Sequence, residues 1–129
     1  MAHWADQYVG RAYTEGDYDC AALVADVLGS QFGRTVTLPA DRPHDPAAAA
    51  RLIDALCEDC ASRIESPIEG CAVLLRRGRL ARPWHIGVYF ERGGEGCGLH
   101  SLRETGAIIT RLRGLDRMGY QIEGYYQWI

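Results

Sequence analysis

The stretch from Trp84 to Phe90 reads WHIGVYF and decides how the second half of the chain folds. Successive side chains of a strand point to opposite faces, so Trp84 and every second residue after it form one apolar face. His85 falls on the other face together with Gly87, and a glycine in a strand leaves room for another element to approach closely. The pattern predicts a strand that buries one face in the core and carries a titratable histidine on the other.

Gly93 and Gly94, which follow this strand, have a composition that favours a two-residue hairpin turn. In the register that such a turn imposes, Gly87 faces His100 on the next strand. His85 and His100 then become diagonal neighbours on one face, about 7–8 Å apart at the backbone, and two imidazole side chains can close that gap. A loop longer by one residue would change the register and separate the histidines, and both would then be structural residues of the sheet.

Cys20 stands where a polar turn gives way to apolar residues at helical spacing. We predict a helix from Cys20 to about Phe32, with the Asp19 carboxylate as its N-cap and Gly33 as its end. A thiol at the start of a helix lies where negative charge is favoured, which stabilises the thiolate. A cysteine hydrolase requires at least a thiol and a histidine that activates it, and this histidine is often distant in the sequence.

Helical patterns occupy the first half of the chain and strand patterns the second half. This order favours an α+β fold over an alternating βαβ fold. We expect one domain over residues 1–129, in which N-terminal helices pack on a C-terminal antiparallel sheet of about five strands. The expected helices cover residues 2–9, 20–32 and 46–61, and the expected strands cover residues 71–76, 84–91, 97–102, 106–112 and 121–129.

The composition argues against two classes of partner. The net charge of −3 and the isoelectric point near 5.8 provide no overall attraction to nucleic acid or to anionic lipid. No apolar run has the length needed to cross a bilayer, and the N-terminal residues lack the basic and apolar regions of a secretory signal. We therefore expect neither a nucleic-acid partner nor insertion into a membrane, and another route of delivery if the protein acts outside the cytoplasm.

The chain has five cysteines, and this odd number argues against a complete disulfide framework. Cys57 and Cys60 form a CxxC pair, but no second pair at matching spacing supports a structural zinc site. Residues three apart on a helix share a face, so both thiols could pack inward as small hydrophobic groups. A redox or metal pair is the alternative.

In their order and spacing these motifs resemble those of the NlpC/P60 cysteine peptidases, a family with a papain-like fold. The family pattern is a turn with a tyrosine, an Asp-Cys pair that opens a helix, a strand, a His-Val-Gly-Ile-Tyr strand and a last strand with a polar residue, often histidine. The matching stretches here are Tyr8–Tyr13, Asp19–Val24, Glu69–Leu74, His85–Tyr89 and Gly98–Ser101. The match runs from about residue 4 to the end, and within the family the chain looks like the short phage-tail or prophage members.

The resemblance implies a role for each candidate residue. Cys20 would be the nucleophile, His85 the general base and acid, and His100 the group that orients His85. The backbone N–H of Cys20 and the hydroxyl of Tyr13 would donate hydrogen bonds to the oxyanion, although Tyr13 could instead be a packed aromatic residue. The resemblance implies no metal and no cofactor.

The implied reaction is hydrolysis of an amide bond in a peptidoglycan stem peptide, typically after a D-γ-glutamyl residue, through an acyl-enzyme. The implied partners are this stem peptide and, for a tail component, other phage tail proteins. The protein would be made in the bacterial cytoplasm without a signal peptide and would act on the cell wall as a virion component, a holin-dependent lysin or a secreted effector. The arginines between residues 76 and 82 could meet substrate carboxylates or form a solvated basic loop.

Three other functions remain open from the sequence. An acyltransferase or amidase on the same scaffold would use the same three residues. A catalytically idle tail-assembly or interaction protein would keep only the fold. A zinc site could be built from Cys20, His85 and His100.

Overall fold

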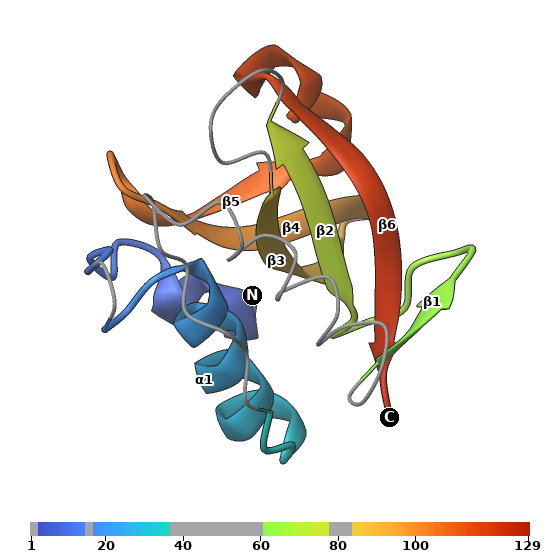
Figure 1. The fold of residues 1–129 in the computed structure, drawn as a ribbon, viewed down its shortest axis with the longest axis horizontal. Helices are drawn as coiled ribbons and strands as arrows, with labels where there is room; N and C mark the ends of the chain where they lie inside the picture. The colour runs from blue at the N-terminus through green and yellow to red at the C-terminus, as the bar shows by residue number, and fades with distance from the viewer. Residues whose placement is uncertain (1–2, 15–16, 37–60, 78–83) are drawn as a thin grey trace.

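The computed structural model describes residues 3–14, 17–36, 61–77 and 84–129 (Figure 1). The chain begins with a short 3-10 helix, η1 (Trp4–Tyr8), which is followed by the α-helix α1 (Cys20–Phe32). The strands are β1 (Ala61–Ile64), β2 (Ala72–Arg77), β3 (Trp84–Arg92), β4 (Glu95–Leu102), β5 (Gly106–Arg111) and β6 (Tyr120–Trp128). Two further 3-10 helices, η2 (Leu112–Gly114) and η3 (Asp116–Met118), connect β5 to β6.

Within the described residues, six strands form one antiparallel sheet in the order β1-β6-β2-β3-β4-β5. The helix α1 packs against β3 and β4, and Figure 1 shows it on one side of the sheet. Helical elements precede the strands along the chain, as the sequence predicts. The α+β class and the antiparallel C-terminal sheet are therefore confirmed.

The sheet has one more strand than predicted, because the sequence gives no clear signal for β1. Its pattern assigns Ala61 to the end of a helix, and β1 (ASRI) contains a single β-branched residue, Ile64. Pairing with the C-terminal half of β6, from Ala61 opposite Trp128 to Ile64 opposite Tyr125, supports this strand. The prediction of about five strands is wrong for this reason, since a short strand depends more on its partner than on its own propensity.

The helix α1 has both of the ends that the sequence predicts. The Asp19 side chain accepts a hydrogen bond of 2.9 Å from the backbone N–H of Ala22 and so caps the N-terminus. Gly33 ends the helix in the left-handed conformation, with φ of 64°, which a glycine adopts without a steric penalty. These local signals make Cys20 the first residue of the helix.

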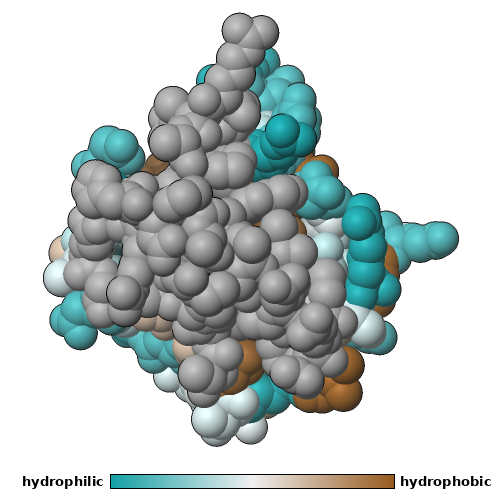
Figure 2. Space-filling model, viewed as in Figure 1, coloured by the Kyte–Doolittle hydropathy of each residue, from teal (hydrophilic) through white to brown (hydrophobic). Residues whose placement is uncertain are grey.

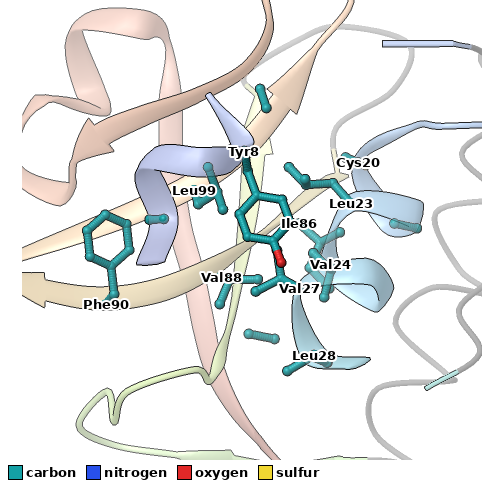
Figure 3. Packing of buried hydrophobic residues seen from close by; sticks show 14 of the residues in the cluster. Tyr8, Cys20, Leu23, Val24, Val27, Leu28, Ile86, Val88, Phe90 and Leu99 are labelled. Carbon is teal, nitrogen blue, oxygen red and sulfur yellow. The ribbon is translucent and has the colours of Figure 1, made fainter. Parts of the chain in front are cut away.

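The apolar cluster between α1 and the sheet is here called the helix-side core. Side chains from α1 face those of β3 and β4 in this core (Figure 3). Its fully buried members include Leu23, Val24, Val27, Leu28, Ile86, Val88, Phe90 and Leu99. Burial of each such side chain is worth about 1.5–3 kcal/mol. The predicted apolar face of β3 is thus confirmed at residues 86, 88 and 90.

A second apolar cluster, here called the far-side cluster, lies on the opposite face of the sheet. It consists of Cys71, Val73, Leu75, Tyr89, Leu115 and Tyr120. The members from β2 and β3 alternate along each strand with members of the helix-side core, which places the two clusters on opposite faces. Leu115, between η2 and η3, covers this face, so both faces of the sheet are buried.

Hydrophobic side chains on the described surface are scattered. The large exposed ones are Val9, Ile68, Ile122 and Ile129. In the view of Figure 2, brown atoms form small separate patches among teal ones in the coloured part of the surface, which is ordinary for a globular domain. Val9, which the pattern of residues 2–9 suggests on the buried side of the first helix, is 49% exposed, whereas Ala5 and Tyr8 are buried.

Several predictions concern residues outside the described part of the chain. These are the helix from Pro46, the CxxC pair of Cys57 and Cys60, and part of the arginine-rich segment. In the four described ranges, no helix combines the length and the apolar character that spanning a membrane requires.

Candidate active site

Cys20 lies at the N-terminus of α1 and within the helix-side core, where it is only 1% exposed. Its thiol is not part of a disulfide. Ile86, the neighbour of His85 in β3, belongs to the same core (Figure 3). The N-terminus of a helix favours the thiolate form of a cysteine at such a position.

A network of hydrogen bonds holds the turn before Cys20 against α1. Thr14 and Tyr18 exchange backbone hydrogen bonds of 2.9 and 2.7 Å across the turn. The Tyr18 hydroxyl donates to the Asp26 carboxylate at 2.6 Å, and the Arg11 guanidinium donates to the same oxygen at 2.6 Å. Burial, assisted by the bond to Asp26, raises the pKa of Tyr18 to about 12. Tyr18 therefore remains a protonated donor at neutral pH and holds the turn on the helix.

His85 and His100 contact each other inside the protein. Nε2 of His85 lies 2.9 Å from Nδ1 of His100, and the ring centroids are 5.1 Å apart. His85 is 8% exposed and His100 is 1% exposed. The pairing of the two histidines on one face is thus confirmed.

The hairpin register that the sequence predicts produces this contact. Arg92 pairs with Glu95 across a turn in which Gly93 and Gly94 have φ of 61° and 79°. Positive φ at both central residues is characteristic of the two-residue turn that matches the twist of a hairpin. The turn therefore has the length on which the histidine pairing depends.

Gly87 allows β4 to approach β3 closely at the histidine pair. A Cβ atom at this position would lie 2.9 Å from the carbonyl oxygen of Leu99 and 3.1 Å from Cβ of His100. Real Cβ atoms essentially never come that close to a backbone oxygen. The predicted role of this glycine, to leave room for another element, is confirmed.

Thr110 and Met118 continue the polar chain behind His100. Nε2 of His100 lies 2.9 Å from Oγ1 of Thr110. The Thr110 hydroxyl is placed to donate to Sδ of Met118 at 3.8 Å. Neither residue was predicted from the sequence. Alternation along the strand could have indicated Thr110, because it shares a face with Ile108, which pairs with His100.

Tyr120 packs against both imidazole rings from the far-side cluster. Its ring is stacked on His85, with centroids 5.4 Å apart and planes at 28°, and meets His100 edge-on at 6.2 Å. Tyr120 was not predicted from the sequence either, since its position depends on the irregular pairing of β2 with β6 near Leu74 and Leu75.

Burial lowers the pKa of His100 from its ordinary 6.5 to about 4. His100 is therefore neutral at pH 7, with one ring nitrogen that donates and one that accepts a hydrogen bond. A neutral imidazole beside His85 can orient that ring without opposing its protonation through a second positive charge.

Tyr13 is half-buried on the turn that precedes Cys20. The guanidinium carbon of Arg103, in the turn after β4, lies 6.0 Å from the centre of its ring. The start of the same turn is joined to β5, because the Gly10 N–H donates to the Ala107 carbonyl and the Ala107 N–H to the Arg11 carbonyl, both at 2.9 Å. The turn that carries Tyr13 therefore lies against the end of the sheet that carries His100.

The structure thus brings His85 and His100 into contact on the face of β3 opposite the helix-side core, and it places Cys20 in that core together with Ile86, the neighbour of His85. Among the described side chains, which include all three of these, no group of three His, Cys, Asp or Glu residues is arranged to hold a metal ion. A groove of about 530 Å³ between β1 and β6 is lined by Arg63, Ile64, Glu65, Ile122, Glu123, Gly124 and Tyr125. None of the four predicted site residues contributes to that lining.

Comparisons with known proteins add no relative to this description. Neither a scan against protein-family models nor a search of the curated proteins gives a match to the chain.

Proposed function

We propose that the protein is a cysteine hydrolase of the NlpC/P60 type, with a papain-like fold, that cleaves an amide bond in a peptidoglycan stem peptide. The observation that carries the proposal is the buried contact of 2.9 Å between His85 and His100. The histidine motif and the hairpin turn indicate the same pair from the sequence alone. A helix that begins at Cys20 and packs on the strands of both histidines supports the proposal further.

In the proposed reaction, His85 takes the proton of the Cys20 thiol, and the thiolate attacks the amide carbonyl. Because Nε2 of His85 contacts His100, the nitrogen that serves the thiol is Nδ1, on the other side of the ring. The imidazolium then gives its proton to the departing amine, and an acyl-enzyme remains. A water molecule deprotonated by His85 releases the acid and restores the thiol.

Negative charge develops on the carbonyl oxygen in both steps and requires hydrogen-bond donors. The proposed donors are the backbone N–H of Cys20 and the hydroxyl of Tyr13. Attachment of the turn before Cys20 to both α1 and β5 supports these roles, because a fixed donor stabilises the transition state without reorganisation. The choice of a D-γ-glutamyl bond, and of phage tail proteins as partners at the cell wall, rests on the resemblance of the sequence motifs.

One observation favours a second candidate, a catalytically idle interaction protein on the same fold. Cys20 is 1% exposed, and a nucleophile must be reached by its substrate. The two candidates differ in the behaviour of the thiol, because an idle protein has no need of a thiolate.

Thiol reactivity as a function of pH tests the proposal directly. Cys20 should react with an alkylating reagent well below the usual thiol range, and His85→Ala should abolish this reactivity. Cys71 is the internal control, since burial raises the pKa of its thiol, and it should react only at higher pH. Ordinary titration of Cys20 would count against catalysis.

Product analysis then separates hydrolysis from acyl transfer. Purified stem peptides should yield one new amine and one new acid with the wild-type protein, and neither with Cys20→Ala. Addition of an amine acceptor should divert the acyl group only if the protein is an acyltransferase.

A further inference from the structure

We propose that Thr110 is a positioning residue that holds His100 in the tautomer with its proton on Nε2, so that Nδ1 accepts a hydrogen bond from His85. The inference rests on the proposed function, because it concerns the same site. It adds a fourth residue, on a third strand, to the three that the sequence motifs indicate.

A continuous chain of polar contacts links His85, His100, Thr110 and Met118. It runs from Nε2 of His85 to Nδ1 of His100 at 2.9 Å, and from Nε2 of His100 to Oγ1 of Thr110 at 2.9 Å. It ends where the Thr110 hydroxyl meets Sδ of Met118 at 3.8 Å. The members come from β3, β4, β5 and η3 in turn, so one arrangement of protons must satisfy contacts on four elements.

When His85 is protonated, the hydrogens on the two imidazole rings allow hydrogen bonds to be donated in one direction only, from His85 through His100 to Thr110. After His85 takes the thiol proton, both of its nitrogens carry hydrogen, and Nε2–H must donate to Nδ1 of His100. A neutral His100 then has its one proton on Nε2 and donates it to Oγ1 of Thr110. The threonine hydroxyl keeps its own proton for the sulfur of Met118, a weak acceptor.

The opposite direction is incompatible with acid–base chemistry at His85. If Thr110 donated to Nε2 of His100, the His100 proton would sit on Nδ1. It would then face the Nε2–H of a protonated His85 across 2.9 Å. Two N–H groups in that position repel each other, so this tautomer disfavours the imidazolium that the reaction needs.

The surroundings of the histidine pair suit an uncharged positioning group. The ring of Tyr120, an ionisable side chain, packs on both imidazoles. A carboxylate in place of Thr110 would also accept from Nε2, but it would favour a charged His100. The threonine hydroxyl orients His100 and leaves it neutral.

Nitrogen NMR of the protein labelled with ¹⁵N-histidine tests the tautomer without reference to activity. In the wild-type protein at pH 7, Nε2 of His100 should have the shift of a protonated nitrogen and Nδ1 that of an unprotonated one. Thr110→Ser should preserve this pattern, because the hydroxyl remains. Thr110→Val, which has the same shape without the hydroxyl, should mix the two tautomers.

Kinetics give the second readout. Thr110→Val should lower kcat by about 10–100-fold while KM changes little, as expected when a group that orients a catalytic residue is removed. Thr110→Ser should restore most of kcat. Thr105→Val is the matched control, since its hydroxyl bonds only to the neighbouring Gly106 carbonyl among the described contacts, and its kcat should be that of the wild type.

Two results would overturn the inference. One is a wild-type His100 with its proton on Nδ1, and the other is a Thr110→Val protein with unchanged tautomer and kcat. The NMR result decides the tautomer even if no stem peptide is cleaved and Cys20 titrates as an ordinary thiol. Failure of the proposed function is thereby distinguished from failure of the role of Thr110.

Discussion

The two faces of β3 differ in the forces that hold them in place. On the helix-side face, Ile86, Val88 and Phe90 are fully buried against other apolar groups, and such contacts have no preferred direction. On the opposite face, His85 is held by a hydrogen bond that requires a particular distance and tautomer. One strand thus supplies non-directional apolar packing from one face and a directional polar contact from the other. Substitutions on the two faces should then have separable effects.

The largest effect is expected at His85. His85→Ala should remain folded but lose at least about 10⁴-fold in kcat, because the proton acceptor and donor of the proposed reaction is removed. Stem-peptide hydrolysis and circular dichroism on the same sample measure the two properties. A variant that keeps more than a tenth of wild-type kcat would show that His85 is not the base.

The next effect concerns stability on the helix-side face. Phe90→Ala should lower the free energy of unfolding by about 3–5 kcal/mol, since it leaves a cavity beside His3 and Trp4, whose rings pack on Phe90. Tyr89→Phe, the neighbour on the opposite face, removes only a hydroxyl and should change it by less than about 1 kcal/mol. Urea unfolding of both variants makes the comparison. Equal losses would contradict the assignment of stability to the helix-side face.

A pH-dependent effect is expected from His100. Its pKa is about 4 in the folded protein and 6.5 in the unfolded chain, so the unfolded chain binds the proton more tightly. The contribution of His100 to the free energy of unfolding is complete above pH 6.5. It is lost as the pH falls towards 4, and the total loss is roughly 3 kcal/mol. Urea unfolding between pH 7 and pH 4 measures the slope. His100→Gln, which does not titrate, should flatten it, and an unchanged slope would assign the effect to other groups.

The smallest effect is expected at the turn before Cys20, away from both faces of β3. Tyr18→Phe removes one of the three side-chain donors to Asp26 among the described residues and should lower the free energy of unfolding by about 1 kcal/mol. Thermal unfolding measures the change, and Ser30→Ala, which removes a weaker bond of 3.2 Å to the same carboxylate, is the control. A larger loss in the control would contradict the role given to Tyr18.

The features that the sequence predicts correctly are those with local causes. The ends of α1 follow from Asp19 and Gly33, and the register of β3 with β4 follows from Gly93 and Gly94. Each of these residues acts within a few positions of itself. Because the register fixes which faces meet, the pairing of the histidines could be predicted as well.

Of the features that escaped prediction, β1 and Tyr120 depend on contacts between distant segments, whereas Thr110 lies ten residues from His100 across the β4–β5 hairpin. Thr110 matters only because β5 pairs with β4 in one register, and Tyr120 only because β6 pairs irregularly with β2. β1 exists through its pairing with β6. No direct turn joins β6 to β1 or to β2, because other strands lie between them in the sequence.

The two backbone hydrogen bonds between Ala107 and the turn at Gly10 and Arg11 have a consequence for folding. They join a segment near the start of the chain to a strand near its end, and contacts of such high sequence separation form slowly because a long loop must first be closed. The helix α1 can form early from its own caps, but the turn that presents Cys20 reaches its final position only after β5 has joined the sheet. Cys20 therefore reaches its final position late, after β5 has been synthesised and has paired with β4.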